Sequence, residues 1–139
     1  VSYDLGKSWS KPETLMKHTS SRSYLAKLQS DDYILVTNDD VTKRKNMTAF
    51  LSTDECKTFD KKLLLDGRES TSYPAGCVDS DGTVYVAYDY NRYSDEEVYF
   101  ASFTKENILH GKRVLPKLIE KGKCGRKTNK VFENGTFNK

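Results

Sequence analysis

The chain contains 139 residues, of which 36% are hydrophobic, 31% are charged and 12% are aromatic, and its net charge at pH 7 is +3. This length suits one compact unit and is too short for several domains. The low hydrophobic fraction favours a surface-rich β protein and argues against a helical bundle with a thick core. No apolar run approaches the roughly 20 residues that a membrane-spanning helix needs.

The sequence repeats itself at an offset of 50 residues, because the segment SYDLGKSW at 2–9 recurs as STDECKTF at 52–59. Around the two copies lie short runs rich in Val, Ile, Tyr, Phe and Thr, bounded by turn-forming residues, and such runs predict β-strands. In chain order the predicted strands are 24–28, 34–38, 47–52, 62–65, 74–78, 84–88 and 98–102. A further segment at 115–119 is compatible with an outer strand or with a short helix.

Four strands in about 45 residues predict one blade of a β-propeller, a four-stranded antiparallel sheet whose innermost strand lines a central channel. We place blades at about 23–66 and 73–119 and assign residues 1–16 to the outer edge of a preceding blade. Two blades cannot close a ring, and each exposes a face that suits a neighbour. We therefore expect a C-terminal part, 1–119, of a longer propeller that is unstable or prone to associate on its own.

The repeated octapeptide resembles the Asp-box, or bacterial neuraminidase repeat, with the pattern Ser-x-Asp-x-Gly-x-(Ser/Thr)-Trp. The first copy is complete and comprises Ser2, Asp4, Gly6, Ser8 and Trp9. The second copy, with Cys in place of Gly and Phe in place of Trp, comprises Ser52, Asp54, Cys56, Thr58 and Phe59. The third expected copy, near Ser102, has decayed.

The resemblance implies an all-β, sialidase-like propeller, six-bladed in the full protein. It also implies a structural role for the box: the Asp accepts hydrogen bonds in a tight hairpin, Gly supplies a positive φ, and the aromatic residue anchors the hairpin. Asp-boxes also occur in xyloglucanases and sortilin-type receptors, so the box argues for a fold more than for a function.

The segment 43–104 resembles the last third of sialidases in the order and spacing of its motifs. By this resemblance Tyr73 matches the catalytic nucleophile, although Pro74 follows it where many sialidases have Ser. Arg44 matches the third of three arginines that hold the substrate carboxylate, and Arg22 opens the preceding innermost strand and is a further candidate for substrate binding. A tyrosine packed at a blade edge and a plain basic turn are the alternatives for Tyr73 and Arg44.

Other charged residues are assigned more ordinary roles. Arg68 is interpreted as a loop charge. The acidic stretch around Asp89, beside Arg92, is interpreted as a solvated loop, and Asp89 is its one residue of interest because it ends a strand near Tyr73. Cys77 is predicted to be a buried small hydrophobe.

The implied function is that of an exo-α-sialidase, a glycoside hydrolase that removes terminal sialic acid from glycoconjugates with a Tyr nucleophile. Two further arginines, an Asp acid/base and an activating Glu are then expected upstream of Val1, so the chain alone should be inactive. The alternatives are a non-catalytic glycan-binding or scaffolding propeller and a propeller glycosidase that acts on another polysaccharide through paired carboxylates.

The expected partners are a sialylated or other glycan and the upstream blades, with no metal, cofactor or nucleic acid. Basic residues concentrate at the C-terminus, where 120–139 is predicted to be a solvated tail or, less often for such tails, a surface that attracts glycans or membranes. Asn-x-Thr triplets at Asn46 and Asn134 favour a secreted or cell-surface protein, but such triplets also arise by chance.

Overall fold

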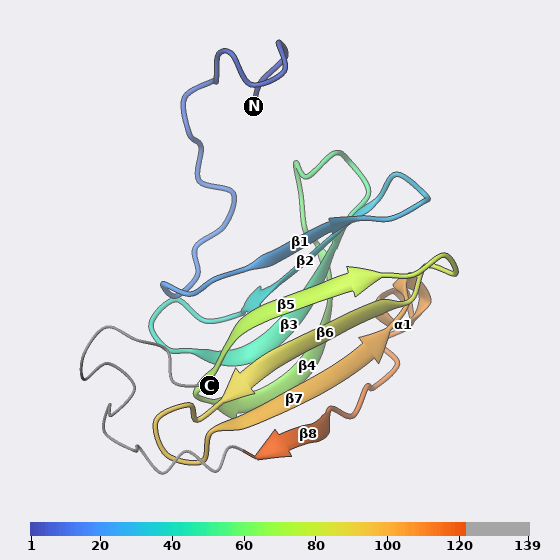
Figure 1. Ribbon diagram of the computed structural model, residues 1–139. Coiled ribbons are helices and arrows are strands. Elements are labelled where there is room, and N and C mark those ends of the chain that lie inside the picture. Colours follow the sequence, from blue (N-terminus) through green and yellow to red (C-terminus); the bar gives the residue numbers. More distant parts are fainter. Residues whose placement is uncertain (122–139) are drawn as a thin grey trace, which may run out of the picture.

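The computed structural model describes residues 1–121 and contains two four-stranded antiparallel sheets with one short helix (Figure 1). The first sheet comprises β1 (Tyr24–Lys27), β2 (Tyr33–Asn38), β3 (Lys45–Ser52) and β4 (Lys61–Glu69). The second comprises β5 (Thr71–Val78), β6 (Val84–Tyr90), β7 (Glu97–Phe103) and β8 (Lys117–Lys121). Helix α1 (Lys105–Leu109) lies between β7 and β8. In both sheets the spatial order equals the chain order, so each is a simple meander.

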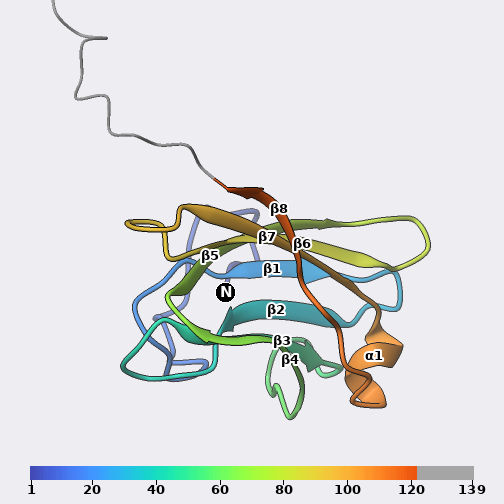
Figure 2. The ribbon, with the colours of Figure 1, turned by 90° about the horizontal axis from the view of Figure 1, so that it is seen from below.

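The two sheets lie in two layers, one over the other (Figure 2). Side chains alternate across a strand, so every second residue can enter the space between the layers. Ile34 and Val36 of β2 and Val84 and Val86 of β6 are fully buried. They belong to one hydrophobic cluster to which both sheets contribute, and burial of this apolar surface is the main force that holds the sheets together.

The predicted all-β class is confirmed, and each meander resembles a propeller blade, while the six-bladed ring stays a prediction. The segment that was compatible with strand or helix forms a strand, β8. The predicted tail at 120–139 therefore begins inside β8, and the rest of it lies outside the described residues. No helix in the described part of the chain is long and apolar enough to cross a membrane.

The prediction that Cys77 is buried is wrong, because its side chain is exposed. β5 is the edge strand of its sheet, and the core takes residues of the opposite parity from this strand, including the fully buried Pro74. A strand-like sequence therefore indicated burial, but on the wrong face of the strand.

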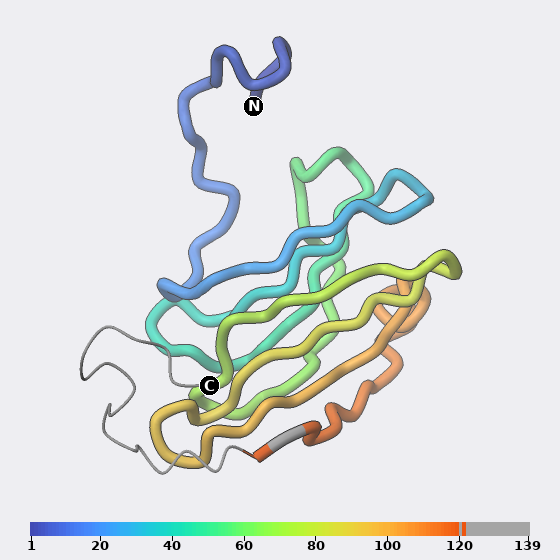
Figure 3. Tube along the Cα trace, in the orientation of Figure 1, coloured from blue at the N-terminus to red at the C-terminus, as the bar shows by residue number. Residues whose placement is uncertain are grey.

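The two Asp-box segments adopt the same hydrogen-bonded turn. In the first, the Asp4 carboxylate accepts hydrogen bonds from the Ser8 amide (2.9 Å) and hydroxyl (2.7 Å), and Ser2 Oγ accepts from the Gly6 amide (2.8 Å). The second forms its equivalents at Asp54, Thr58, Ser52 and Cys56, with distances of 2.9, 2.7 and 3.0 Å. The second turn joins β3 to β4, whereas the first stands away from both sheets (Figure 3).

The hydrogen bonds in these turns also lower the pKa values of their aspartates. The pKa values of Asp4 and Asp54 are each lowered to about 2, chiefly because the backbone amides of Ser8 and Thr58, respectively, donate to the ionised carboxylates. Near the decayed third copy, the chain instead begins α1, whose first turn is closed by a capping box between Thr104 and Asn107.

The second Asp-box predicts a stabilising substitution. Cys56 has φ of 65° at the position where Gly6 has 86°, and a side chain in this left-handed region costs about 1 kcal/mol. Cys56→Gly is therefore expected to raise the free energy of unfolding by up to about that amount, measured by urea denaturation of the full-length protein. Cys56→Ser, which keeps the Cβ, should give no such gain, and an equal gain from both variants would attribute the effect to the thiol.

Candidate functional site

The loops that carry the candidate residues lie at one end of the two meanders. The β2–β3 loop, the β4–β5 connection and the β6–β7 loop are at this end, and the β3–β4 hairpin with its Asp-box is at the other (Figure 1). A buried amide links the sheets here, because Asn38 Nδ2 of β2 donates to the Thr71 carbonyl of β5 (3.0 Å). The site is therefore built across two sheets.

Arg44, in the β2–β3 loop, turns away from its basic neighbours. Lys43 pairs with Glu69 (3.1 Å) and Lys45 with Asp40 (3.1 Å). The Arg44 guanidinium instead donates to the Ser20 carbonyl, at 3.3 Å from Nε and 3.1 Å from Nη2, and from Nη2 to the Tyr73 hydroxyl at 3.5 Å. These two acceptors are neutral, and Arg44 forms no ion pair within residues 1–121.

Tyr73 lies at an irregularity near the start of β5. The register of β5 against β6 shifts between Ser72 and Ala75, and Tyr73 has φ of 55°. Ser72 and Pro74 are buried on either side of it, whereas Tyr73 keeps 37% of its surface exposed. A β-bulge re-aims a side chain in this way, and such strained positions concentrate at functional sites.

A second guanidinium, that of Arg92 in the β6–β7 loop, lies over the same tyrosine. Its Cζ atom is 4.0 Å from the centroid of the Tyr73 ring, and the Cζ atom of Arg44 is 5.0 Å from that centroid. Arg92 forms an ion pair with Asp89, which also accepts a hydrogen bond from Ser72 Oγ (2.6 Å). Asp89, near the end of β6, is thus an ordered part of the site, as its place at a strand end near Tyr73 suggested, although the acidic stretch as a whole was interpreted as a solvated loop.

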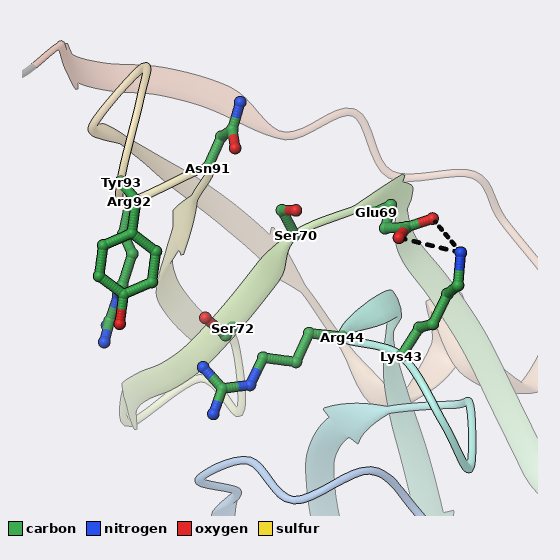
Figure 4. A pocket seen from close by; sticks show the side chains of 8 residues that line it. All are labelled: Lys43, Arg44, Glu69, Ser70, Ser72, Asn91, Arg92 and Tyr93. Carbon is green, nitrogen blue, oxygen red and sulfur yellow. Dashed lines mark hydrogen bonds and ion pairs between the residues drawn. The ribbon is translucent and has the colours of Figure 1, made fainter.

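A cavity of about 190 Å³, lined by charged and polar residues, adjoins these groups (Figure 4). Arg44 enters it from the first sheet and Arg92 from the second. Its lining consists of Lys43, Arg44, Glu69, Ser70, Ser72, Asn91, Arg92 and Tyr93. Tyr73 is not part of that lining, but Arg44 contacts its hydroxyl and Arg92 lies over its ring, so a ligand in the cavity would adjoin the same two cations.

The comparison with known protein families fits this architecture. The family model described as BNR repeat-like domain matches residues 1–86. The chain belongs to the BNR repeat-like domain family. The matched region contains both Asp-box turns, Arg44 and Tyr73, and it ends within β6, before Asp89 and Arg92. No curated protein and no solved structure gives a significant match.

The remaining predicted residue of this BNR repeat-like chain, Arg22, does not join the site. It precedes β1 at the same end of the molecule and is exposed, and no hydrogen bond or ion pair of its side chain occurs within residues 1–121. Its role in substrate binding stays a prediction that needs neighbours beyond those described here.

The interpretation of Arg68 as a loop charge is wrong. It lies in β4, with its guanidinium Cζ 4.0 Å from the ring centroids of both Tyr90 and Tyr99, and it pairs with Asp66 at 2.6 Å. The tyrosines belong to the other sheet, so Arg68 bridges the two layers of this BNR repeat-like fold. Sequence gives no signal for such a contact, because the partners are more than twenty residues away along the chain.

Proposed function

We propose that this BNR repeat-like protein is an exo-sialidase-like glycoside hydrolase, in which Tyr73 is the nucleophile and Arg44 binds the substrate carboxylate. The observation that carries the proposal is the 3.5 Å contact of Arg44 Nη2 with the Tyr73 hydroxyl, beside the cavity. Two residues that the family resemblance paired, 29 positions apart in the chain, are thereby within reach of one sugar.

The proposed chemistry follows from the substrate. Sialic acid carries a carboxylate on the carbon that is attacked, so a negatively charged nucleophile is repelled and a tyrosine hydroxyl is preferable. The Tyr73 oxygen forms a bond to that carbon as the bond to the leaving oxygen breaks; Tyr73 loses its proton to a base, and the leaving oxygen receives one from an acid. Water then releases the sugar and restores the tyrosine. The resemblance assigns the acid and the base to blades outside this chain.

Arg44 suits the role of carboxylate ligand. A guanidinium presents two parallel N–H groups that match the two oxygens of a carboxylate. Its hydrogen bonds to the neutral Ser20 carbonyl fix the side chain without removing its charge. The neighbouring lysines are both paired with acidic residues, so Arg44 rather than the whole basic turn is the ligand.

The proposal is tested with the full-length protein and two fluorogenic substrates, a sialoside and the corresponding neutral galactoside. We expect release from the sialoside alone, and Arg44→Gln should raise the KM for it by about 10- to 100-fold, because a charge-assisted hydrogen-bond pair is lost. Arg113→Gln, in the exposed segment between α1 and β8, is the matched control and should change nothing. Release from the galactoside only, or from neither substrate, contradicts the proposal.

A second candidate is a glycan-binding propeller without catalysis. It is favoured by the state of the carboxylates near Tyr73, since Glu69 is paired with Lys43 and Asp89 with Arg92, and neither is placed as a free acid or base. The same pairing disfavours a mechanism through two carboxylates within this site. Binding of N-acetylneuraminic acid without release from the sialoside would identify this second function.

A further inference from the structure

Arg92 occupies a position that neither the family match nor the sequence motifs assign. Its guanidinium lies over the Tyr73 ring, as does that of Arg44, and both line the same cavity. The Cζ atoms of Arg44 and Arg92 lie 5.0 and 4.0 Å from the same ring centroid, so the distance between them cannot exceed the sum of these two values. Arg44 comes from the first sheet and Arg92 from the second, so they approach a ligand from two independent supports (Figure 4).

The loop that carries Arg92 is held in one conformation by its own hydrogen bonds. The Asn91 amide donates to the Ser70 carbonyl across the sheet (2.9 Å). The Asn91 carbonyl in turn accepts from the amides of three residues, at 2.9, 3.0 and 3.2 Å: Ser94, Asp95 and Glu96. Asn91 has φ of 50°, a left-handed conformation that asparagine tolerates. Such a loop presents Arg92 at low entropic cost to binding.

The charge of Arg92 is also fixed in position. Asp89 takes Nε and Nη2 of the guanidinium, and Ser72 donates to the other oxygen of Asp89. Partial burial disfavours the charged form of Arg92, but the hydrogen bonds and the charge of Asp89 outweigh it, so the pKa of Arg92 is raised. Nη1 takes no part in this ion pair, and the Tyr93 side chain, which lines the same cavity, is a further hydrogen-bond partner of the guanidinium.

We propose that Arg92 is a second substrate-binding arginine, which contacts the carboxylate of the sugar together with Arg44, and that Asp89 is the residue that positions it. This inference rests on the proposed function, because it takes the carboxylated sugar as the ligand. Two guanidinium groups from separate sheets discriminate against an uncharged sugar more strongly than one, since both can form charge-assisted hydrogen bonds to a carboxylate that an uncharged group cannot form. Arg92 is thereby a determinant of specificity.

The test compares N-acetylneuraminic acid with its uncharged methyl ester as ligands of the full-length protein, by calorimetry or ligand-detected NMR. Arg92→Gln is expected to weaken binding of the acid by about 10- to 100-fold and to leave binding of the ester nearly unchanged. Arg92→Lys, which keeps the charge but loses the planar fork, should fall between. Arg113→Gln again serves as the control. Equal losses for acid and ester would show that Arg92 acts only on the local structure and would overturn the inference.

A second variant separates positioning from contact. Asp89→Asn removes the charge that holds Arg92 but keeps an acceptor oxygen, so it should weaken binding of the acid by less than Arg92→Gln does. In the double variant, adding Asp89→Asn to Arg92→Gln should weaken binding little further. Full additivity of the two substitutions contradicts the positioning role of Asp89.

The outcomes also separate this inference from the proposed function. If the protein cleaves the sialoside and Arg92→Gln changes neither KM nor acid binding, the inference fails and the function stands. If the protein binds the acid in an Arg92-dependent way but cleaves nothing, the catalytic proposal fails and the inference stands. If it shows no preference for the acid over the ester, both fail.

Discussion

Tyr73→Phe is expected to lower kcat for a fluorogenic sialoside by at least about 10³-fold, because the variant lacks the oxygen that forms the covalent bond. Binding of N-acetylneuraminic acid should change by only a few-fold, since the ring that lies beneath Arg44 and Arg92 is retained. The measurement is steady-state hydrolysis by the full-length protein together with calorimetric binding. A fall in kcat without a matching loss of binding is the signature of a residue that acts in the transition state.

The control for this variant is Tyr3→Phe, because Tyr3 is 95% exposed in the N-terminal segment and should be neutral. A fluorinated sialoside that slows breakdown of the covalent intermediate adds a direct readout: its sugar should be found on the peptide that contains Tyr73 and be absent from the Phe variant. Unchanged turnover in Tyr73→Phe, or label on another residue, would remove Tyr73 from the mechanism.

The structural features that could be predicted from the sequence are those that depend on residues close to one another along the chain. Asp4 and Asp54 bond to residues four positions later, so the octapeptide alone specifies both turns, and Cys56 accepts the positive φ because these bonds surround it. The β-strands follow from alternation and from turn residues in the same way. The exposure of Cys77 could not be predicted, since it depends on which face of β5 meets the other sheet.

The candidate site was predictable only in part, for a related reason. Arg44 and Tyr73 could be paired because a known family places them in the same order, not because spacing alone brings them together. Arg92 and Arg68 both contact aromatic rings on strands that are not their own, and only the packing of the two meanders determines these contacts. A charged residue that stacks on a distant ring has the same sequence signature as one on a solvated loop.

A buried polar contact joins the two sheets at Asp66. Asp66 is 6% exposed and accepts hydrogen bonds from Arg68 (2.6 Å) and from the hydroxyl of Tyr88 (2.8 Å), which is 1% exposed. Burial alone would raise the pKa of Asp66, but hydrogen bonds from Arg68 and Tyr88 outweigh it and the pKa is lowered. Burial and the charge of Asp66 raise the pKa of Tyr88. One carboxylate thus satisfies a cation of one sheet and a hydroxyl of the other.

Asp66→Ala is expected to lower the free energy of unfolding by about 3 kcal/mol, because it leaves the Tyr88 hydroxyl buried without an acceptor and Arg68 without its anion. The measurement is urea denaturation of the full-length protein, with hydrogen exchange of β4 and β6 amides to locate the loss. Asp66→Asn should cost less, since it keeps an acceptor, and Tyr88→Phe should be milder because it removes the donor and leaves the ion pair.

The ion pair between Asp66 and Arg68 also predicts how the stability of the protein depends on pH. The folded-state pKa of Asp66 lies below its unfolded value of about 3.9, so its contribution is fully present at neutral pH and is lost as the pH falls through the folded-state pKa. The difference in stability between the wild type and Asp66→Asn should therefore shrink below about pH 4 and stay constant between about pH 6 and 8. A difference that grows on acidification means that Asp66 is protonated in the folded protein, and Arg68 then has no anion to hold the two sheets together.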